Sequence, residues 1–130
     1  MAEAETAIKS RLESSTANLS GAGAIWAILA PQDAVKPYLV FEVLDENPVN
    51  VMGQETVPTE CTVSVSVYAD TFLECVNASN DVRTVLTRYS GVADGVTVQD
   101  CFYEGRSDNY DEGDREYSRE LTFRLHYNEV

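Results

Sequence analysis

The segment Glu60–Asp70 alternates strictly between apolar and polar side chains, and no other segment constrains the fold of this chain as strongly. The apolar positions of the alternation are Cys61, Val63, Val65, Val67 and Ala69. The polar positions between them are Thr62, Ser64, Ser66 and Tyr68. Side chains of a strand point to opposite faces with a period of two, so this pattern predicts a strand with one buried face. Such half-buried strands are typical of antiparallel sheets.

A helix is predicted directly after this strand. Thr71-x-x-Glu74 has the form of a capping box, in which the threonine hydroxyl accepts from a backbone N–H group and the glutamate reaches back. The residues that follow recur at helical spacing, and Gly91 is the expected end. The expected apolar stripe of this main packing helix is Phe72, Cys75, Val76, Ser79, Val82, Val85, Leu86 and Tyr89.

The first third of the chain predicts weaker elements. Apolar spacing indicates a short helix over residues 3–14, and Ile25–Leu29 reads as a brief strand or an extended segment laid on the core. Tyr38–Leu44 is a strand with apolar residues on both faces, which is typical of an interior strand or an oligomer contact. Residues 45–59 have no clear period and are expected to form a long loop or arm.

The last third predicts two strands joined by an acidic hairpin loop. The strands are Val96–Tyr103 and Tyr117–Tyr127, and the loop is Glu104–Glu116. Together the elements predict an α+β protein of one domain, residues 1–130. Its mainly antiparallel sheet has four to five strands, with two helices packed on one face and long β-hairpin loops.

The formal net charge of −13 is the most unusual property of the composition. This charge repels phosphate, so a protein that binds nucleic acid by releasing counterions is not expected. Two interpretations of the acidic surface stay open, solubility and a functional surface. No apolar run approaches the length that crosses a bilayer, and the start of the chain has no basic region followed by an apolar one. We therefore expect neither a membrane span nor a signal peptide.

Residues with catalytic or metal-binding chemistry do not form a recognisable site. The three cysteines are widely spaced without a C-x-x-C pair, so they are expected to be reduced and buried. The single histidine, His126, lies on the polar side of its strand. Asp108–Asp114 only superficially resembles a calcium loop, because Tyr110 and Arg119 would fall on ligand positions. We expect no metal, no cofactor and no catalytic residue.

Several short motifs, taken in their order along the chain, resemble one known family. The motifs are Ala30-Pro-Gln, Lys36-Pro-Tyr-Leu-Val-Phe41, Cys61-Thr-Val-Ser-Val-Ser-Val-Tyr-Ala-Asp70, the helix to Val82-Arg-Thr-Val-Leu86, and Tyr117-Ser-Arg-Glu-Leu-Thr-Phe-Arg-Leu-His-Tyr127. This succession, which spans nearly the whole chain, resembles the tail-completion or tail terminator family of long-tailed bacteriophages and prophages. The motifs contain no catalytic residue.

The resemblance implies a structural virion protein with an α+β fold. It implies a homo-oligomeric ring, commonly a hexamer, that caps the head-proximal end of the tail tube, stops tube polymerisation and offers a surface to the head–neck connector. The implied partners are the tube protein and the connector or stopper protein, and DNA passes through the ring without specific binding. The implied location is the tail or neck of a virion assembled in the host bacterial cytoplasm.

Three groups of residues are candidates for these contacts. The candidate lumen or docking loop is Asp108, Tyr110, Asp111, Glu112 and Asp114. The candidate arm that contacts the tube or a neighbouring subunit is Glu46, Asn47, Val49, Val51, Met52, Gln54 and Glu55. The candidate subunit-interface strand is Tyr38, Val40 and Glu42. Two alternatives remain, another neck, head-closure or minor tail protein, and a small α+β enzyme or ligand-binding domain that uses acidic residues.

Overall fold

The computed structural model describes residues 8–9, 11–12, 25–27, 37–48, 58–93, 96–113 and 115–129. Within them, the elements in chain order are β1 (Ile25–Ala27), β2 (Tyr38–Pro48), β3 (Pro58–Ala69), α2 (Phe72–Leu86), β4 (Gly91–Ala93), β5 (Val96–Asp111) and β6 (Glu116–Glu129). The expected first helix has helical backbone at Ile8, Lys9, Arg11 and Leu12, and the rest of its range lies outside the described residues. The only helix that the structure delimits in the described part of the chain is therefore α2.

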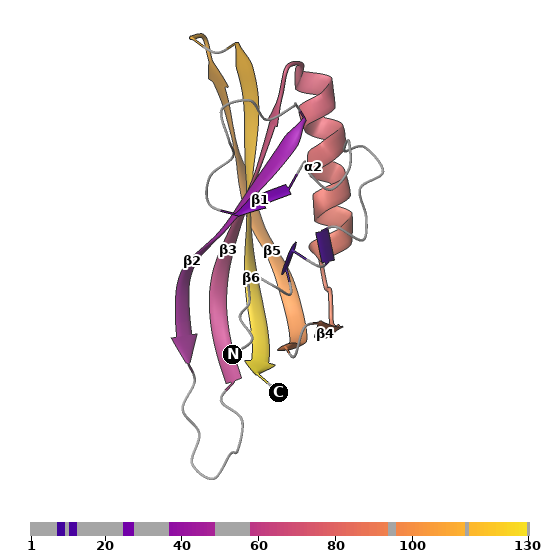
Figure 1. Cartoon of the computed structure of the whole chain (residues 1–130), viewed down its shortest axis with the longest axis vertical. Coiled ribbons are helices and arrows are strands. Elements are labelled where there is room, and N and C mark those ends of the chain that lie inside the picture. Colours follow the sequence, from indigo (N-terminus) through magenta and orange to yellow (C-terminus); the bar gives the residue numbers. More distant parts are fainter. Residues whose placement is uncertain are drawn as a thin grey trace.

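The strands form one tall, twisted sheet in the order β1-β2-β3-β6-β5-β4 (Figure 1). β1 pairs with β2 in parallel, and every other neighbouring pair is antiparallel. The prediction of a mainly antiparallel sheet in an α+β fold is thus confirmed. The predicted number of four to five strands is too low, because the described residues form a sheet of six. The additional strand, β4, pairs with only three residues of β5. A strand this short has no periodicity that distinguishes it from a turn.

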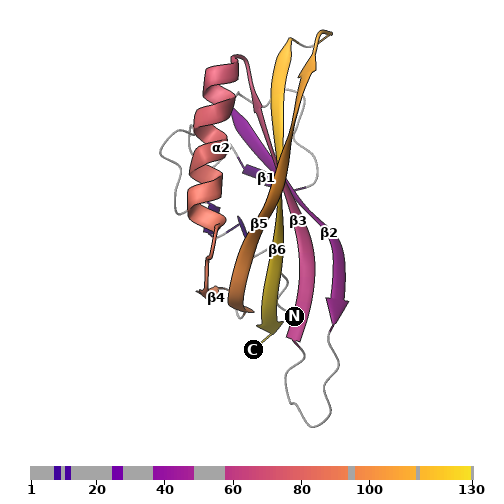
Figure 2. The ribbon, with the colours of Figure 1, turned by 180° about the vertical axis from the view of Figure 1, so that it is seen from behind.

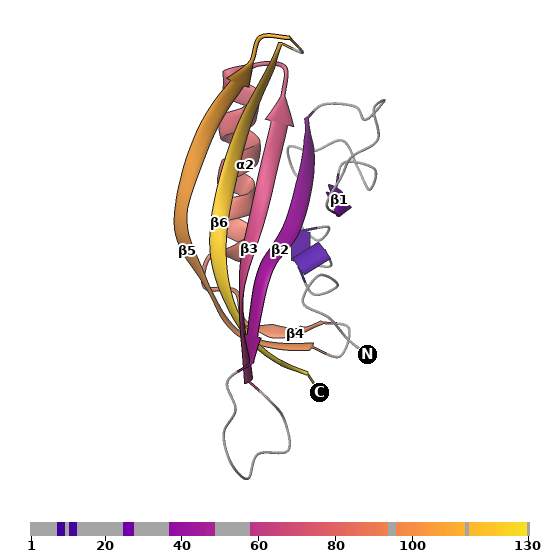
Figure 3. The ribbon, with the colours of Figure 1, turned by 90° about the vertical axis from the view of Figure 1, so that its left-hand side faces the viewer.

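α2 packs against one face of the sheet, across β3, β6 and β5 (Figure 2). Figure 3 looks onto the opposite face, which none of the described elements covers along the middle of β3 and β6. We call this opposite face the outer face. The alternation of β3 explains the arrangement, because all of its apolar positions from Cys61 to Ala69 are fully buried under the helix side.

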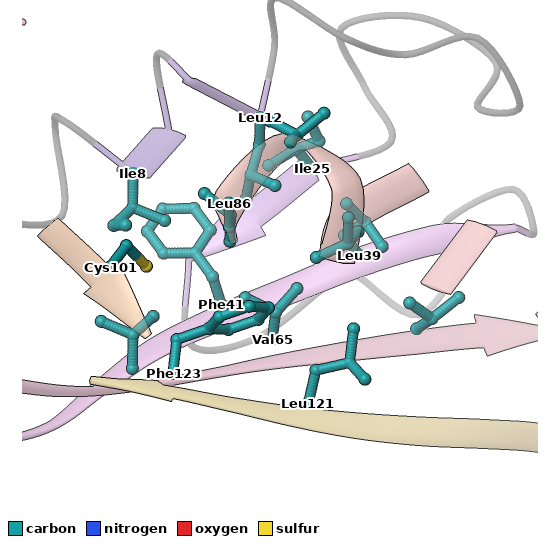
Figure 4. Packing of buried hydrophobic residues seen from close by; sticks show 14 of the residues in the cluster. Ile8, Leu12, Ile25, Leu39, Phe41, Val65, Leu86, Cys101, Leu121 and Phe123 are labelled. Carbon is teal, nitrogen blue, oxygen red and sulfur yellow. The ribbon is translucent and has the colours of Figure 1, made fainter. Parts of the chain in front are cut away.

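The core fills the space between α2, the sheet and the N-terminal segment (Figure 4). Phe41, Val65 and Phe123 project from three strands toward Leu86 of α2, and Ile8 and Leu12 close the cluster from the side. The buried residues of α2 are Cys75, Ala78, Ser79, Val82, Val85 and Leu86. The expected stripe was wrong at its N-terminal end, because Phe72 is 50% exposed.

α2 ends at Leu86, earlier than the predicted end at Gly91. Thr87 has extended backbone, and the positive φ of 60° at Arg88 turns the chain back toward the sheet. The Arg88 N–H group then donates to the Cys101 carbonyl of β5 at 2.7 Å. Tyr89 therefore packs on the core from the connection and not from the helix. At the other end, Thr71 Oγ1 accepts from the Glu74 N–H group at 3.2 Å, which is the predicted N-cap.

Both predicted long loops are shorter than expected. β5 runs to Asp111 and β6 begins at Glu116, so most of the acidic segment 104–116 is a paired two-stranded hairpin. β2 likewise continues to Pro48 and β3 begins at Pro58. These strand ends are rich in charged residues and lie beyond the core. They therefore lack the apolar alternation from which a strand is predicted.

Leu86→Ala should lower the free energy of unfolding by roughly 2–5 kcal/mol, because it leaves a cavity beneath α2. Leu73→Ala on the same helix is the matched control, since Leu73 is 68% exposed and Leu86 is fully buried. The control should change stability by less than about 0.5 kcal/mol. Urea unfolding followed by circular dichroism measures both variants. Equal midpoints for the two would contradict the burial described above.

Cys61, Cys75 and Cys101 are buried free thiols, as the sequence predicted. Burial, with a smaller contribution from the Asp100 carboxylate, raises the pKa of Cys101 from 9.0 to about 12. The native thiol should therefore resist iodoacetamide near pH 8 and react after unfolding in urea.

Because the pKa of Cys101 is raised in the folded state, the associated stability is complete below pH 9.0 and is lost as the pH approaches about 12. Cys101→Ala should make the alkaline loss of stability shallower, as measured by urea unfolding across this pH range.

Candidate assembly surfaces

The β5–β6 hairpin extends past the N-terminal end of α2, so its tip is not covered by the helix (Figure 1). Pairing continues to the end of both strands, where Tyr110 is opposite Tyr117 and Asp111 is opposite Glu116. The Asp111 carboxylate accepts from the Gly113 N–H group at 2.9 Å and closes the turn. The hairpin tip is therefore an ordered projection with a defined inner face.

A buried arginine joins the hairpin to α2. Arg119 is only 3% exposed, and its guanidinium donates to Asp108 at 2.7 Å and to the Ser79 hydroxyl at 3.1 Å. It also lies 5.7 Å from the centre of the Phe72 ring. A buried charge is costly unless it is paired and hydrogen-bonded, and these contacts satisfy it. Since the partners come from β5 and α2, the arginine fixes the angle at which the hairpin leaves the helix.

Aromatic rings lie beside this ion pair. The rings of Tyr110 and Tyr117 are 4.6 Å apart between centroids, and Phe72 meets Tyr117 edge-on at 6.0 Å. A pocket of about 270 Å³ opens here to the solvent. Its lining residues are Phe72, Asp108, Asn109, Tyr110, Tyr117 and Ser118. We call it the tip pocket.

The five residues predicted for a lumen or docking loop therefore have different environments. Asp108 is held by Arg119 on the helix side of the sheet, and Tyr110 lines the tip pocket. Asp111 and Glu112 are exposed at the turn. Asp114 lies outside the described residues. The charge of Asp108 is thus balanced within the fold by Arg119, and the lumen or docking role of these residues stays a prediction.

Only the first two residues of the predicted arm, Glu46 and Asn47, belong to the residues that the structure describes. Glu46 and Asn47 belong to β2, and both are exposed. A register shift between Val43 and Asp45 turns Glu46 toward the helix side, where its carboxylate accepts from the Tyr127 hydroxyl. The other predicted arm residues, Val49, Val51, Met52, Gln54 and Glu55, lie outside the described residues.

The predicted interface strand lies on the outer face. Tyr38 stacks on Tyr68 with centroids 5.1 Å apart, Val40 is half-buried, and Glu42 is exposed. The register shift in β2 leaves Leu44, at the end of the predicted strand, unpaired with β3 and 53% exposed. Farther along the outer face, Arg124 pairs with Glu60 at 3.1 Å and with Glu104 at 3.2 Å.

Comparison with known proteins identifies the family. The family model for "Tail completion protein gp17" matches residues 6–128. The chain belongs to the tail completion family. A chain from a solved structure described as the virion of a native gene transfer agent particle has the same fold, with a TM-score of 0.67 and 12% sequence identity. That likeness covers 97% of this chain and 99% of the other. No curated protein sequence matches this one.

Membership in the tail completion family makes the chain a structural protein of a phage-type virion tail. The described part of the structure contains no helix that is long and apolar enough to cross a membrane. It also brings no three histidine, cysteine or acidic side chains together in a geometry that holds a metal ion. The exposed features of this tail completion protein, among its described residues, are the hairpin tip, the outer face and the end of β2.

Sequence reasoning missed Arg119, Phe72 and Tyr117 as parts of the hairpin tip. A usable signal existed for two of them, because the alternation of β6 continues backward from Leu121 and places Arg119 and Tyr117 on the buried side. An arginine on an apolar side of a strand indicates a buried ion pair. For Phe72 no signal existed, since helical spacing alone assigns it to the core.

Asp108→Ala should destabilise the protein by about 2 kcal/mol, because it leaves the buried Arg119 charge without its carboxylate. The cost stays below that of a fully buried pair, since the Asp108 side chain is 42% exposed. Combining Asp108→Ala with Arg119→Met should recover part of the loss by removing the charge as well. Urea unfolding of the two single variants and the double variant measures the coupling. Additive effects would show that Asp108 and Arg119 do not stabilise each other.

Proposed function

We propose that this protein caps the head-proximal end of a phage tail tube, stops tube polymerisation and provides the surface that joins tail to head. The observation that carries this proposal is the tail completion family match over residues 6–128. The fold shared with a chain of a gene transfer agent virion supports it. Capping a tube needs contact surfaces and no active site. The family match therefore favours a tail terminator over the alternative of a small α+β enzyme or ligand-binding domain.

The proposal includes a ring of identical subunits, most simply a hexamer. The outer face supports it, because a wide sheet surface with Tyr38, Val40 and Glu42 at one side is covered by none of the described elements. β1 and β4 each pair along only three residues of β2 and β5, and these two longer strands carry register shifts at Val43/Asp45, Val98/Asp100 and Tyr103/Gly105. Bulges of this kind hinder pairing with a further strand. We therefore expect subunits to meet through side chains of the outer face and not by extending the sheet.

A terminator needs two opposite contact regions, one for the tube and one for the neck, and the long sheet supplies two ends. Glu46 and Asn47 lie near one end, and the hairpin tip lies at the other (Figure 3). We assign the β2 end and the arm that follows it to the tube protein. The hairpin tip is assigned to the connector or stopper protein of the neck. DNA passes through such a ring without specific binding, since an acidic protein repels phosphate.

Deleting the gene from the phage or prophage that encodes it should give tails of uncontrolled length and heads without tails. Without a cap, the tube end remains a template for further subunits. Electron microscopy of the lysate measures the tail lengths, and expression of the intact protein in trans is the control that restores one length. Tails of normal length attached to heads in the deletion strain would contradict the terminator role.

A purified system separates capping from other neck functions. The protein alone should be a monomer or weak oligomer, and it should form rings on tube ends when it is added to polymerising tube protein. Mass photometry and tube length distributions check both statements. A head-closure or minor tail protein would leave the tube lengths unchanged.

A further inference from the structure

We propose that the tip pocket binds an apolar side chain from a basic segment of the neck protein that meets the tail. The partner is thus a segment in which lysine or arginine residues flank a leucine or an aromatic residue. This inference rests on the proposed function for the identity of the partner. The binding chemistry rests only on the pocket and can be tested without the virion.

The walls of the tip pocket are largely aromatic and accessible. Phe72 is 50% exposed and Tyr110 is 43% exposed, although both rings belong to an ordered cluster with Tyr117. Leu73, beside Phe72, is 68% exposed. Aromatic residues gathered in an open pocket bury large area at a small entropic cost when a partner covers them. Exposed clusters of this kind mark interaction sites more often than isolated exposed apolar residues do.

The charge around the tip pocket is complementary to a basic partner. As far as the structure describes them, residues 70–74 and 108–118 contain six carboxylates and one arginine, Arg115. The carboxylates belong to Asp70, Glu74, Asp108, Asp111, Glu112 and Glu116. Arg119 lies beneath them and pairs with Asp108. An apolar pocket with an acidic rim steers and orients a segment that has the opposite pattern.

A second copy of this chain does not supply that segment. The whole chain has only nine lysine and arginine residues, and they are scattered along it. Several are already engaged: Arg83 lies over the Tyr103 ring, Arg88 pairs with Asp100, and Arg124 pairs with two glutamates. We therefore assign the complementary segment to a different protein.

The buried ion pair makes the tip pocket a preformed site. Arg119 ties β6 to Asp108 of β5 and to Ser79 of α2, so the strand wall and the helix wall of the pocket are held together. A site that is ordered before binding loses little conformational entropy when the partner arrives. A DNA-facing lumen, the other interpretation of these acids, would require negative charge but no aromatic pocket.

Binding is tested on the intact ¹⁵N-labelled protein with three synthetic peptides. The probe is acetyl-Lys-Lys-Leu-Phe-Lys-Lys-amide, and two controls replace Leu-Phe by Ala-Ala or every lysine by glutamate. Amide shifts should be confined to residues near the tip pocket and should saturate. The Ala-Ala control should bind about tenfold more weakly, because it loses the buried apolar area. The glutamate control should not bind, and binding of the probe should weaken as salt screens the rim.

Variants distinguish binding in the tip pocket from non-specific attraction of the basic probe to an acidic protein. Phe72→Ala and Tyr110→Ala should each weaken probe binding about fivefold or more. Leu44→Ala is the matched control, since Leu44 is 53% exposed but lies at the register shift of β2. Asp111→Asn combined with Glu112→Gln should weaken binding and flatten its salt dependence. Glu42→Gln combined with Glu120→Gln removes the same charge from the outer face and should leave binding unchanged.

The results separate this inference from the proposed function. If the probe does not bind, or binds equally well without Leu-Phe, the pocket proposal is overturned even when tube lengths remain controlled. In the virion, Phe72→Ala with Tyr110→Ala should give tails of normal length that do not join heads. Normal joining by this variant would also overturn it, whereas uncontrolled tail length would place the tip at the tube and contradict the neck assignment. Slower DNA ejection from fully joined particles would favour the lumen interpretation.

Discussion

Burial of the apolar face of β3 and β6 beneath α2 is the constraint on which the rest of the structure depends. The two strands pair in register from Pro58↔Asn128 to Ala69↔Tyr117, so their inward residues form one continuous surface for the helix. A slip by one residue would turn every one of these side chains to the solvent, which gives the register a strong energetic preference. The neighbours β2 and β5 pair with this central pair and depart from its regular register only at their bulges. The helix covers only part of the sheet length, and the sheet end beyond it must be stabilised by other means.

At the hairpin tip, polar and aromatic contacts take the place of the core. The Arg119 ion pair and the Phe72–Tyr117–Tyr110 rings link the hairpin to the N-terminal half of α2, next to the part of the hairpin that extends beyond the helix. Such contacts leave side chains accessible to a partner, which an aliphatic core does not. This arrangement lets a small subunit keep a stable core while aromatic side chains at the end of its sheet remain exposed.

Structure follows directly from sequence where a local pattern and the tertiary fold coincide. The alternation of Glu60–Asp70 and the N-cap at Thr71 are both present in the structure, because strand faces and helix starts are determined by neighbouring residues. The ends of the helix and of the strands do not follow from local patterns. The helix stops at Leu86 because Arg88 bonds to Cys101 of β5, a contact that no local pattern records. The acidic segment 104–116 forms strands because each half pairs with the other.

The candidate site shows the same division. The sequence by itself determined the α+β class, the main helix, the buried cysteines and, through short motifs, the family. Tertiary structure alone decided that Asp108 is paired with a buried arginine and that Phe72 forms a pocket with Tyr117 and Tyr110. The physical reason is distance along the chain, because Ser79 and Arg119 are 40 residues apart and meet only after the sheet has formed. Periodicity reports which face a side chain occupies, whereas the partner it meets there depends on how separate elements pack.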